Sequence, residues 1–246
     1  MNGISEGLTS RQTQILKVLI DEYINTAYPV GSEAIEKKYD LGVSPATIRH
    51  EMATLTNSGF LRQPHTSAGR VPTPKAMRFY VDQLMEEKKM SLADEVRAKE
   101  EVWDSRNDIK GLLEKAVQSL SDRTQSLTVG VTDSGYTSHA GMANVFANAE
   151  FANMQVCSDI FSLIEGVSRL QDLFFDHLSG EDVVEVLFGE ELGMPNLGPV
   201  GIVATSMHLG NHKAAIGIIG PTRIGNHTVI PVMRYYSQML REVFGA

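Results

Sequence analysis

The first 60 residues contain three runs of apolar residues at helical spacing, and each run ends at turn-forming residues. The first run follows Ser10 as its cap and ends before Pro29, and the second follows Ser32. The third is capped by Ser44, has a proline at its first helical position, and stops at residues 57–59. The pattern predicts three short helices in the first 60 residues.

A hairpin is predicted directly after the third helix. Residues 60–63 favour a short strand, residues 64–69 form a polar turn, and Arg70 begins the return strand. Thr73 then caps a further helix, with proline again at its first position. Three helices and a hairpin form the plan of a winged helix-turn-helix domain, which we place at residues 1–85.

Residues 86–124 are rich in charge and are predicted to form a helical linker with a break at Gly111. Ser91 and Asp94 resemble a capping box. The apolar positions at three- and four-residue spacing are Leu92, Val96, Trp103, Leu113, Val117 and Leu120. This spacing fits a helix lying on a domain and equally a helix that pairs with its copy in a dimer.

Residues 125–246 mix strands and helices. Strands are expected at 127–131 and 183–188, and a hairpin at 200–219 turns at Gly210-Asn211. Helices are expected at the positions 144–151, 159–178 (capped by Asp159) and 228–243. The fold class is therefore α+β, with a small antiparallel sheet in this third region.

Composition excludes several classes of protein. The 246 residues are 42% hydrophobic with a net charge of −8, which allows a sizeable core and excludes a cationic coat protein. Between Pro45 and Tyr80, however, five basic residues face a single acid, Glu51. One cysteine excludes an internal disulfide framework, and no apolar run approaches the ~20 residues of a membrane span. We expect a cytoplasmic protein with no membrane partner.

The helix that begins at Ser44 is a candidate DNA reader. Its outer side presents Thr47, Arg49 and His50 near the helix start, where side chains reach base edges in a major groove. Arg49 can bind guanine through two hydrogen bonds, while Ser44 or Thr47 can bind phosphate or base. The alternative is a surface helix of a generic helical bundle.

The polar turn strengthens the DNA-binding interpretation. His65, Thr66, Ser67 and Arg70 supply donors, small side chains and a cation, and residues 63–70 contain no acid. Such a wing can follow the DNA backbone while Arg70 reaches phosphate or the minor groove. A solvated loop without this role normally mixes its charges.

These segments resemble the HrcA family of bacterial heat-shock repressors, most closely over residues 8–85. The matching runs are Leu8-Thr9, Arg11-Gln12, Tyr28-Pro29-Val30-Gly31-Ser32, residues 44–55 and Pro64-His65-Thr66-Ser67-Ala68-Gly69-Arg70-Val71-Pro72-Thr73. Weaker matches to the GAF-like C-terminal region of the family lie at Ala149-Glu150-Phe151, Phe188-Gly189-Glu190-Glu191 and residues 217–223.

The resemblance implies a repressor that binds, as a homodimer, an inverted-repeat operator in double-stranded DNA ahead of chaperone genes, with the chaperonin as modulator. It also implies that residues 125–246 form a GAF-like regulatory and dimerisation domain. The chain departs from the family in two places. It is shorter between Thr124 and Gly141, where the family carries the start of the GAF-like domain and an inserted dimerising domain, so we expect a reduced GAF-like domain. Residues 224–227 also differ from the family pattern.

The sequence contains no convincing set of catalytic or metal-binding residues, so we expect neither enzymatic activity nor a bound cofactor or metal. Cys157 is interpreted as a packed thiol, and His208 and His212 as surface residues separated by a turn. The glycines of 217–220 suggest a close backbone approach, and Glu190-Glu191 a charged rim. Two alternatives remain: a GAF-like sensor or enzyme with a pocket near residues 217–223, and a structural adaptor.

Overall fold

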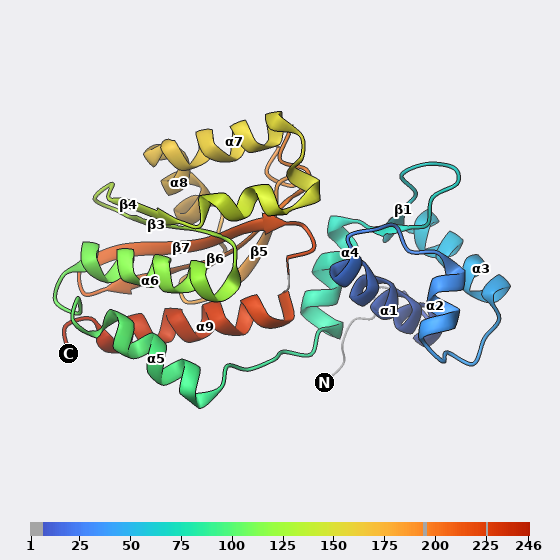
Figure 1. Cartoon of the computed structure of the whole chain (residues 1–246), viewed down its shortest axis with the longest axis horizontal. Coiled ribbons are helices and arrows are strands. Elements are labelled where there is room, and N and C mark those ends of the chain that lie inside the picture. The colour runs from blue at the N-terminus through green and yellow to red at the C-terminus, as the bar shows by residue number, and fades with distance from the viewer. Residues whose placement is uncertain (1–6, 194–195, 225) are drawn as a thin grey trace. The chain divides into compact units, whose positions relative to one another are not determined.

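The structure is a computed structural model that describes residues 7–193, 196–224 and 226–246. The chain divides into two compact units, Met1–Met85 and Glu86–Ala246 (Figure 1). Gly225, one of the positions that depart from the family pattern, lies outside the described residues. Each unit has its own buried core and is considered by itself.

The first unit contains the three predicted helices, α1 (Ser10–Thr26), α2 (Ser32–Lys38) and α3 (Pro45–Asn57). The predicted caps of the first two helices were wrong by one residue. Thr9 caps α1 through a reciprocal capping box with Gln12, and Gly31 precedes α2 without a side-chain cap. Ser10 and Ser32 are instead the first helical residues.

The hairpin follows α3 as the sequence predicts. Strands β1 (Leu61–Arg62) and β2 (Val71–Pro72) pair antiparallel. Thr73 caps α4 (Pro74–Phe79) by accepting a hydrogen bond from the backbone N–H of the third helical residue, and a π-helical turn continues to residue 84. The unit therefore has the element order of a winged helix-turn-helix domain. Its core includes Ile15, Leu16, Leu19, Ile35, Ile48, Leu55 and Phe60.

The second unit is built on a five-stranded antiparallel sheet with the order β4-β3-β7-β6-β5. The strands are β3 (Leu127–Thr132), β4 (Thr137–Ala140), β5 (Glu185–Phe188), β6 (Val200–Leu209) and β7 (His212–Pro221). Strands β6 and β7 form the predicted hairpin, and Gly210 in its two-residue loop has φ +61°. The expected α+β class and antiparallel sheet are confirmed.

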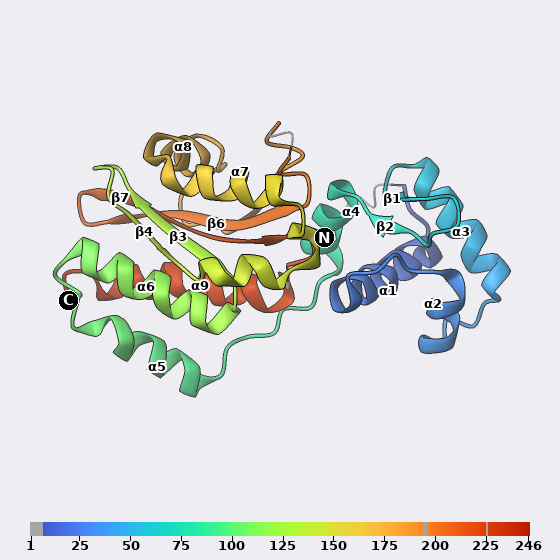
Figure 2. The ribbon, with the colours of Figure 1, turned by 45° about the horizontal axis from the view of Figure 1, so that its top comes forward.

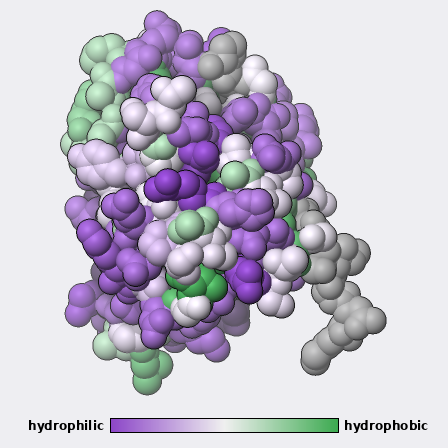
Figure 3. Space-filling view, turned by 90° about the vertical axis from the view of Figure 1, so that its right-hand side faces the viewer, coloured by the Kyte–Doolittle hydropathy of each residue, from purple (hydrophilic) through white to green (hydrophobic). Residues whose placement is uncertain are grey.

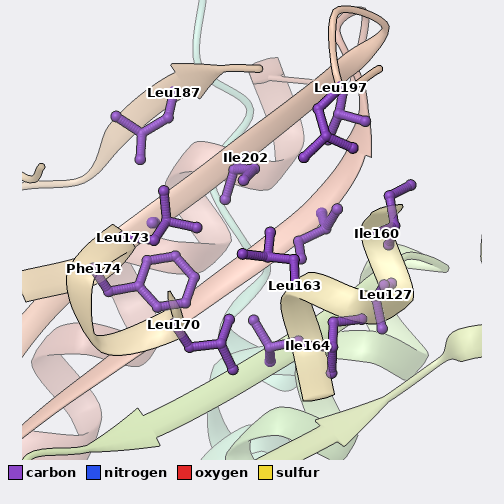
Figure 4. Packing of buried hydrophobic residues seen from close by; sticks show 14 of the residues in the cluster. Leu127, Ile160, Leu163, Ile164, Leu170, Leu173, Phe174, Leu187, Leu197 and Ile202 are labelled. Carbon is purple, nitrogen blue, oxygen red and sulfur yellow. The ribbon is translucent and has the colours of Figure 1, made fainter. Parts of the chain in front are cut away.

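Helices cover both faces of this sheet. Figures 1 and 2 show α6 (Ile109–Thr124) and α9 (Asn226–Val243) on one face, and α7 (Met154–Glu165) and α8 (Val167–Gln171) on the other. A continuous apolar cluster fills the space between α7, α8 and the sheet (Figure 4). Its members include Leu127, Ile160, Leu163, Ile164, Leu170, Leu173, Phe174 and Ile202.

Residues 86–124 do not form a separate linker, contrary to the prediction. They contain α5 (Leu92–Trp103) and α6, and both helices belong to the second unit. The physical reason is α6 itself, whose apolar side, including Leu113 and Val117, is buried above the glycine at position 130 of β3. Gly111 is not a break, because Asp108 caps α6 by accepting from the N–H of Gly111.

Three further details differ from the predictions. The segment 142–151 forms two 3-10 turns rather than a regular helix. The helix expected at 159–178 begins earlier, at Met154 with Asn153 as its cap, and Gly166 divides it into α7 and α8. Strand β4 was not predicted, since only one of its four residues is buried. No helix among the described residues is long and apolar enough to cross a membrane.

Candidate nucleic-acid interface

The start of α3 is fixed by its own side chains. The Ser44 hydroxyl accepts a hydrogen bond from the backbone N–H of Thr47 at 3.2 Å, and the two side-chain oxygens lie 3.0 Å apart. Of the predicted contact residues, Ser44 therefore already acts as the cap of α3, and the Thr47 hydroxyl is hydrogen-bonded to it. Ile48, one helical turn after the cap, is fully buried against the core and orients the helix.

Arg49 and His50 lie on the outer side of α3, as predicted. Both side chains are exposed, and neither has a hydrogen-bond or ion-pair partner in the described part of the chain. An unpaired guanidinium near the start of an exposed helix is free to donate to base edges or to phosphate.

The single acid of the basic segment does not compensate these charges, because Glu51 points toward α1. The Gln12 amide donates to its carboxylate at 3.0 Å, and an Arg11 guanidinium nitrogen lies 3.7 Å from it. Only 15% of the Glu51 side chain is exposed. Within residues 45–80 no acid neutralises Arg49, and the acid nearest to it in the same surface groove is Glu33 at the start of α2, which forms no ion pair with it. Figure 3 shows a largely hydrophilic surface with scattered hydrophobic patches.

The polar turn is held by the amide of Gln63. Its Nε2 atom donates to the backbone carbonyls of Thr66 at 2.9 Å and Ala68 at 3.0 Å. His65, Thr66 and Ser67 are exposed at the tip, as expected for a wing. Because the turn is organised internally, its donors are presented in a defined geometry rather than as a loose loop.

Arg70 fixes the base of the turn instead of standing free in solvent. Its backbone forms two hydrogen bonds with Val30, of 2.8 and 2.9 Å, and its Nε donates to the Thr56 hydroxyl of α3 at 3.1 Å. The neighbouring Gly69 is required by this approach, since a Cβ there would lie 2.4 Å from the Val30 backbone. The remaining guanidinium nitrogens of Arg70 can still donate hydrogen bonds to an anion.

A surface groove of about 400 Å³ joins these elements. Of the predicted contact residues, Arg49, Thr66, Ser67 and Arg70 line it, whereas Ser44, Thr47, His50 and His65 do not. Sequence reasoning missed its other wall, which consists of residues 31–33 at the start of α2. The only signal for that wall was the matching run at residues 28–32. The groove also includes Met52, Gln63, Ala68 and Gly69.

Among the described residues, no group of three or more His, Cys, Asp or Glu side chains is placed to hold a metal ion. Cys157 is buried, and its thiol donates to the Phe151 carbonyl. His208 and His212 lie on neighbouring strands and face different carboxylates, those of Glu181 and Asp133. The two histidines therefore do not form a pair of metal ligands.

The motifs of the second unit serve packing. Arg223 Nε donates to Glu150 at 2.5 Å, which joins two of the weak sequence matches directly. Phe174 fills the space above Gly217, where an added Cβ would lie 2.4 Å from its ring, and Ile224 does the same above Gly220. The close approach predicted for these glycines is confirmed.

A helix with an exposed, unpaired arginine and a wing organised by its own hydrogen bonds, joined in one chain to an α+β unit, have the organisation of a DNA-binding transcription regulator. The sequence model described as HrcA protein C terminal domain matches residues 73–230. The chain belongs to the HrcA family.

The chain is similar in sequence to two named relatives and similar in fold to one solved structure. A protein of Carboxydothermus hydrogenoformans, named "Heat-inducible transcription repressor HrcA", is 26% identical over 339 aligned positions, covering 97% of this chain and 98% of the relative. Because the chain has only 246 residues, this alignment contains long gaps. A protein of the same name from Acetivibrio thermocellus is 43% identical over 136 residues, 55% of this chain and 35% of the relative.

The crystal structure of a protein described as hypothetical has a TM-score of 0.74 at 17% identity. The match covers 96% of this chain and 98% of that chain. At this level of identity, the likeness concerns the fold.

Proposed function

We propose that this chain is a transcriptional repressor of heat-shock genes that binds an inverted-repeat operator in the cytoplasm as a homodimer. The observation that carries the proposal is the exposed and unpaired Arg49 on α3, whose one acid, Glu51, is held by α1. Its membership of the HrcA family and the names of its relatives support the same function.

The contacts divide between two tasks. Arg49, together with Thr47 and His50 near the helix start, reads base edges in the major groove. His65, Thr66 and Ser67 on the wing follow the sugar-phosphate backbone, and Arg70 at its base adds a cation. Ser44 presents the first turn of α3, whose backbone N–H groups favour a phosphate.

The test is a fluorescence titration of the full chain with an inverted-repeat duplex and with a scrambled duplex at several salt concentrations. We expect tighter binding to the inverted repeat and a logarithmic salt slope proportional to the number of phosphate contacts. Lys115→Ala is the control, because Lys115 is an exposed cation on α6 in the second unit. Equal affinity for both duplexes would refute operator recognition.

We further propose that the chaperonin modulates this binding, as the family resemblance implies. Adding purified chaperonin to the same titration should raise the fraction of chain competent for DNA binding. A ligand pocket near residues 217–223 is not supported, because Phe174 and Ile224 fill the space beside the glycines there.

A further inference from the structure

Helix α5 exposes a row of large apolar side chains along one side. Leu92 is 75% exposed, Val96 is 50% exposed and Trp103 is 38% exposed. With Lys99 they follow the spacing four, three, four, which places all four on one stripe of the helix. Leu92 and Lys99 are seven residues apart, as are Val96 and Trp103, and this is the heptad spacing of a helix-pairing seam.

The apolar stripe of α5 cannot be buried within the second unit, because another side of the helix already packs against α6 and α9. Ala98 and Val102 are fully buried. The Tyr235 hydroxyl of α9 donates to the Glu95 carbonyl at 2.7 Å, and Arg123 of α6 pairs with Glu101 at 3.2 Å. These contacts fix the rotation of α5 about its axis and leave the apolar stripe in solvent. In Figures 1 and 2, α5 lies outermost on this side of the second unit.

Arg106 fixes the position of the Trp103 side chain and backbone. The Arg106 guanidinium lies 4.8 Å from the centre of its ring and donates to its backbone carbonyl at 3.1 Å. The ring also borders a depression of about 340 Å³ lined by Val96, Lys99, Glu100 and Asp104. A tryptophan fixed beside a depression is the kind of residue that contributes most to interfaces, because little side-chain freedom is lost on binding.

We propose that the stripe is a dimer contact, on which α5 of a second copy packs antiparallel across a two-fold axis. In this arrangement Leu92 lies opposite Trp103 of the second copy, and Val96 lies opposite the aliphatic stem of Lys99. The two-fold axis repeats each contact, so the same stripe serves both chains. The inference deepens the proposed function, because an inverted-repeat operator requires two chains related by such an axis.

Charge complementarity favours a second copy over a different protein. Lys99 lies within the seam, and Glu100 borders Val96 at a distance of four residues along the helix. When Lys99 packs on Val96 of the second copy, its ammonium group reaches Glu100 of that copy, and the axis generates the same pair again. A stripe with charges of one sign would repel its own copy.

The size of the contact sets the expected strength. Helix α5 has 12 residues, so it is about 18 Å long. One such helix pair buries less than the roughly 1,200 Å² of a standard stable interface. We therefore expect a dimer that dissociates at micromolar concentration and that becomes tighter when both chains hold one operator.

The test is analytical ultracentrifugation of the full chain over about 1 to 100 µM, the range expected for a contact of this size. Val96→Glu should leave monomers throughout. Lys99→Glu should raise the dissociation constant about tenfold or more, and the double change Lys99→Glu with Glu100→Lys should restore most of the loss. Phe146→Glu, at an exposed apolar residue outside α5, is the matched control and should have no effect.

Circular dichroism would verify that each variant folds. A chain that stays monomeric, a Val96→Glu variant that still dimerises, or a double variant without recovery would overturn the interface. Binding to a half-site duplex distinguishes a failure of the proposed interface from a failure of the proposed function. If the wild type binds the half-site but never dimerises, only the interface fails. If it dimerises through α5 but binds no DNA, the repressor function fails and the interface stands.

Discussion

At the scale of single residues, Glu51 decides the character of the candidate interface. Its carboxylate is bound by Gln12 and lies near Arg11, so the acid stabilises the contact between α1 and α3 instead of neutralising Arg49. Gln12 has a second task, since it also completes the capping box with Thr9. Gln12, which belongs to the residues that match the HrcA family, therefore helps to fix the orientation of α3.

Arg49→Ala should separate base reading from general attraction to DNA. We expect a loss of about 1–3 kcal/mol on the operator and a much smaller loss on random DNA, because only the operator offers matched base edges. Titrations on both duplexes measure the difference, with Lys115→Ala as the control for removal of a cation. Equal losses on the two duplexes would mean that Arg49 contacts only phosphate.

The residues of α3 could be predicted from sequence because their roles are local. Ser44, Pro45 and the buried positions follow from capping and helical periodicity alone. The contact of Glu51 with Gln12 could not be predicted, since it joins positions 39 residues apart. The anchoring of Arg70 by Thr56 has the same cause, because it depends on how the hairpin folds back on α3.

At the scale of elements, the wing is a turn with its base tied at two places, through Val30 and through Thr56. Arg70→Ala should weaken binding to operator and random DNA alike and lower the salt slope by about one unit, because a phosphate contact carries no sequence information. Thr56→Val removes the anchor but keeps the charge. It should weaken binding without changing the salt slope, which salt titrations of both variants would show. A slope unchanged by Arg70→Ala would contradict a phosphate contact.

Helices α5, α6 and α9 are joined by a polar network around Tyr236. Its buried hydroxyl contacts Ser119 and accepts from Arg123 Nε at 2.8 Å, and Arg123 also pairs with Glu101. Burial raises the pKa of the Tyr236 phenol, so this hydroxyl stays neutral. The network holds α5 in the orientation that exposes its apolar stripe.

Tyr236→Phe should lower the free energy of unfolding by about 1–3 kcal/mol, because it removes the two hydrogen bonds of a buried hydroxyl, with Ser119 and with Arg123. Tyr235→Phe is the matched comparison. It removes one bond, to the Glu95 carbonyl, from a half-buried site and should cost only about 0.5–1.5 kcal/mol. Urea unfolding measures both variants. Equal costs would show that the network adds nothing beyond a single bond.

Elements with strong periodicity or a clear turn were predictable, and those set by tertiary contacts were not. The β6–β7 hairpin followed from its apolar strands and Gly210-Asn211. Strand β4 is a half-exposed edge strand, so its sequence carries little hydrophobic signal. The charge of residues 86–124 predicts a linker, but the buried side of α6 makes them part of the second unit.

At the scale of the whole molecule, the two units differ in how well their polar groups are satisfied. Three hydroxyls, those of Thr128, Thr205 and Ser237, are buried without a hydrogen-bond partner in the described structure, and all belong to the second unit. Each such group costs about 1–3 kcal/mol. Removing one of these hydroxyls should therefore stabilise the second unit, which tests whether that unit sets the temperature at which DNA is released.

Thr205→Val should therefore raise the temperature at which the full chain releases its operator. The change removes an unsatisfied hydroxyl at nearly constant volume, and about 1 kcal/mol of added stability corresponds to roughly 2–4 °C for a unit of this size. Thr132→Val is the matched control, because the Thr132 hydroxyl is bonded to Ser134 and to the Tyr136 N–H, and its loss should lower the temperature. DNA binding by fluorescence during heating, beside calorimetric melting, measures both effects. If Thr205→Val raises the melting temperature of the second unit while DNA is released at the wild-type temperature, heat must act on the reading unit itself.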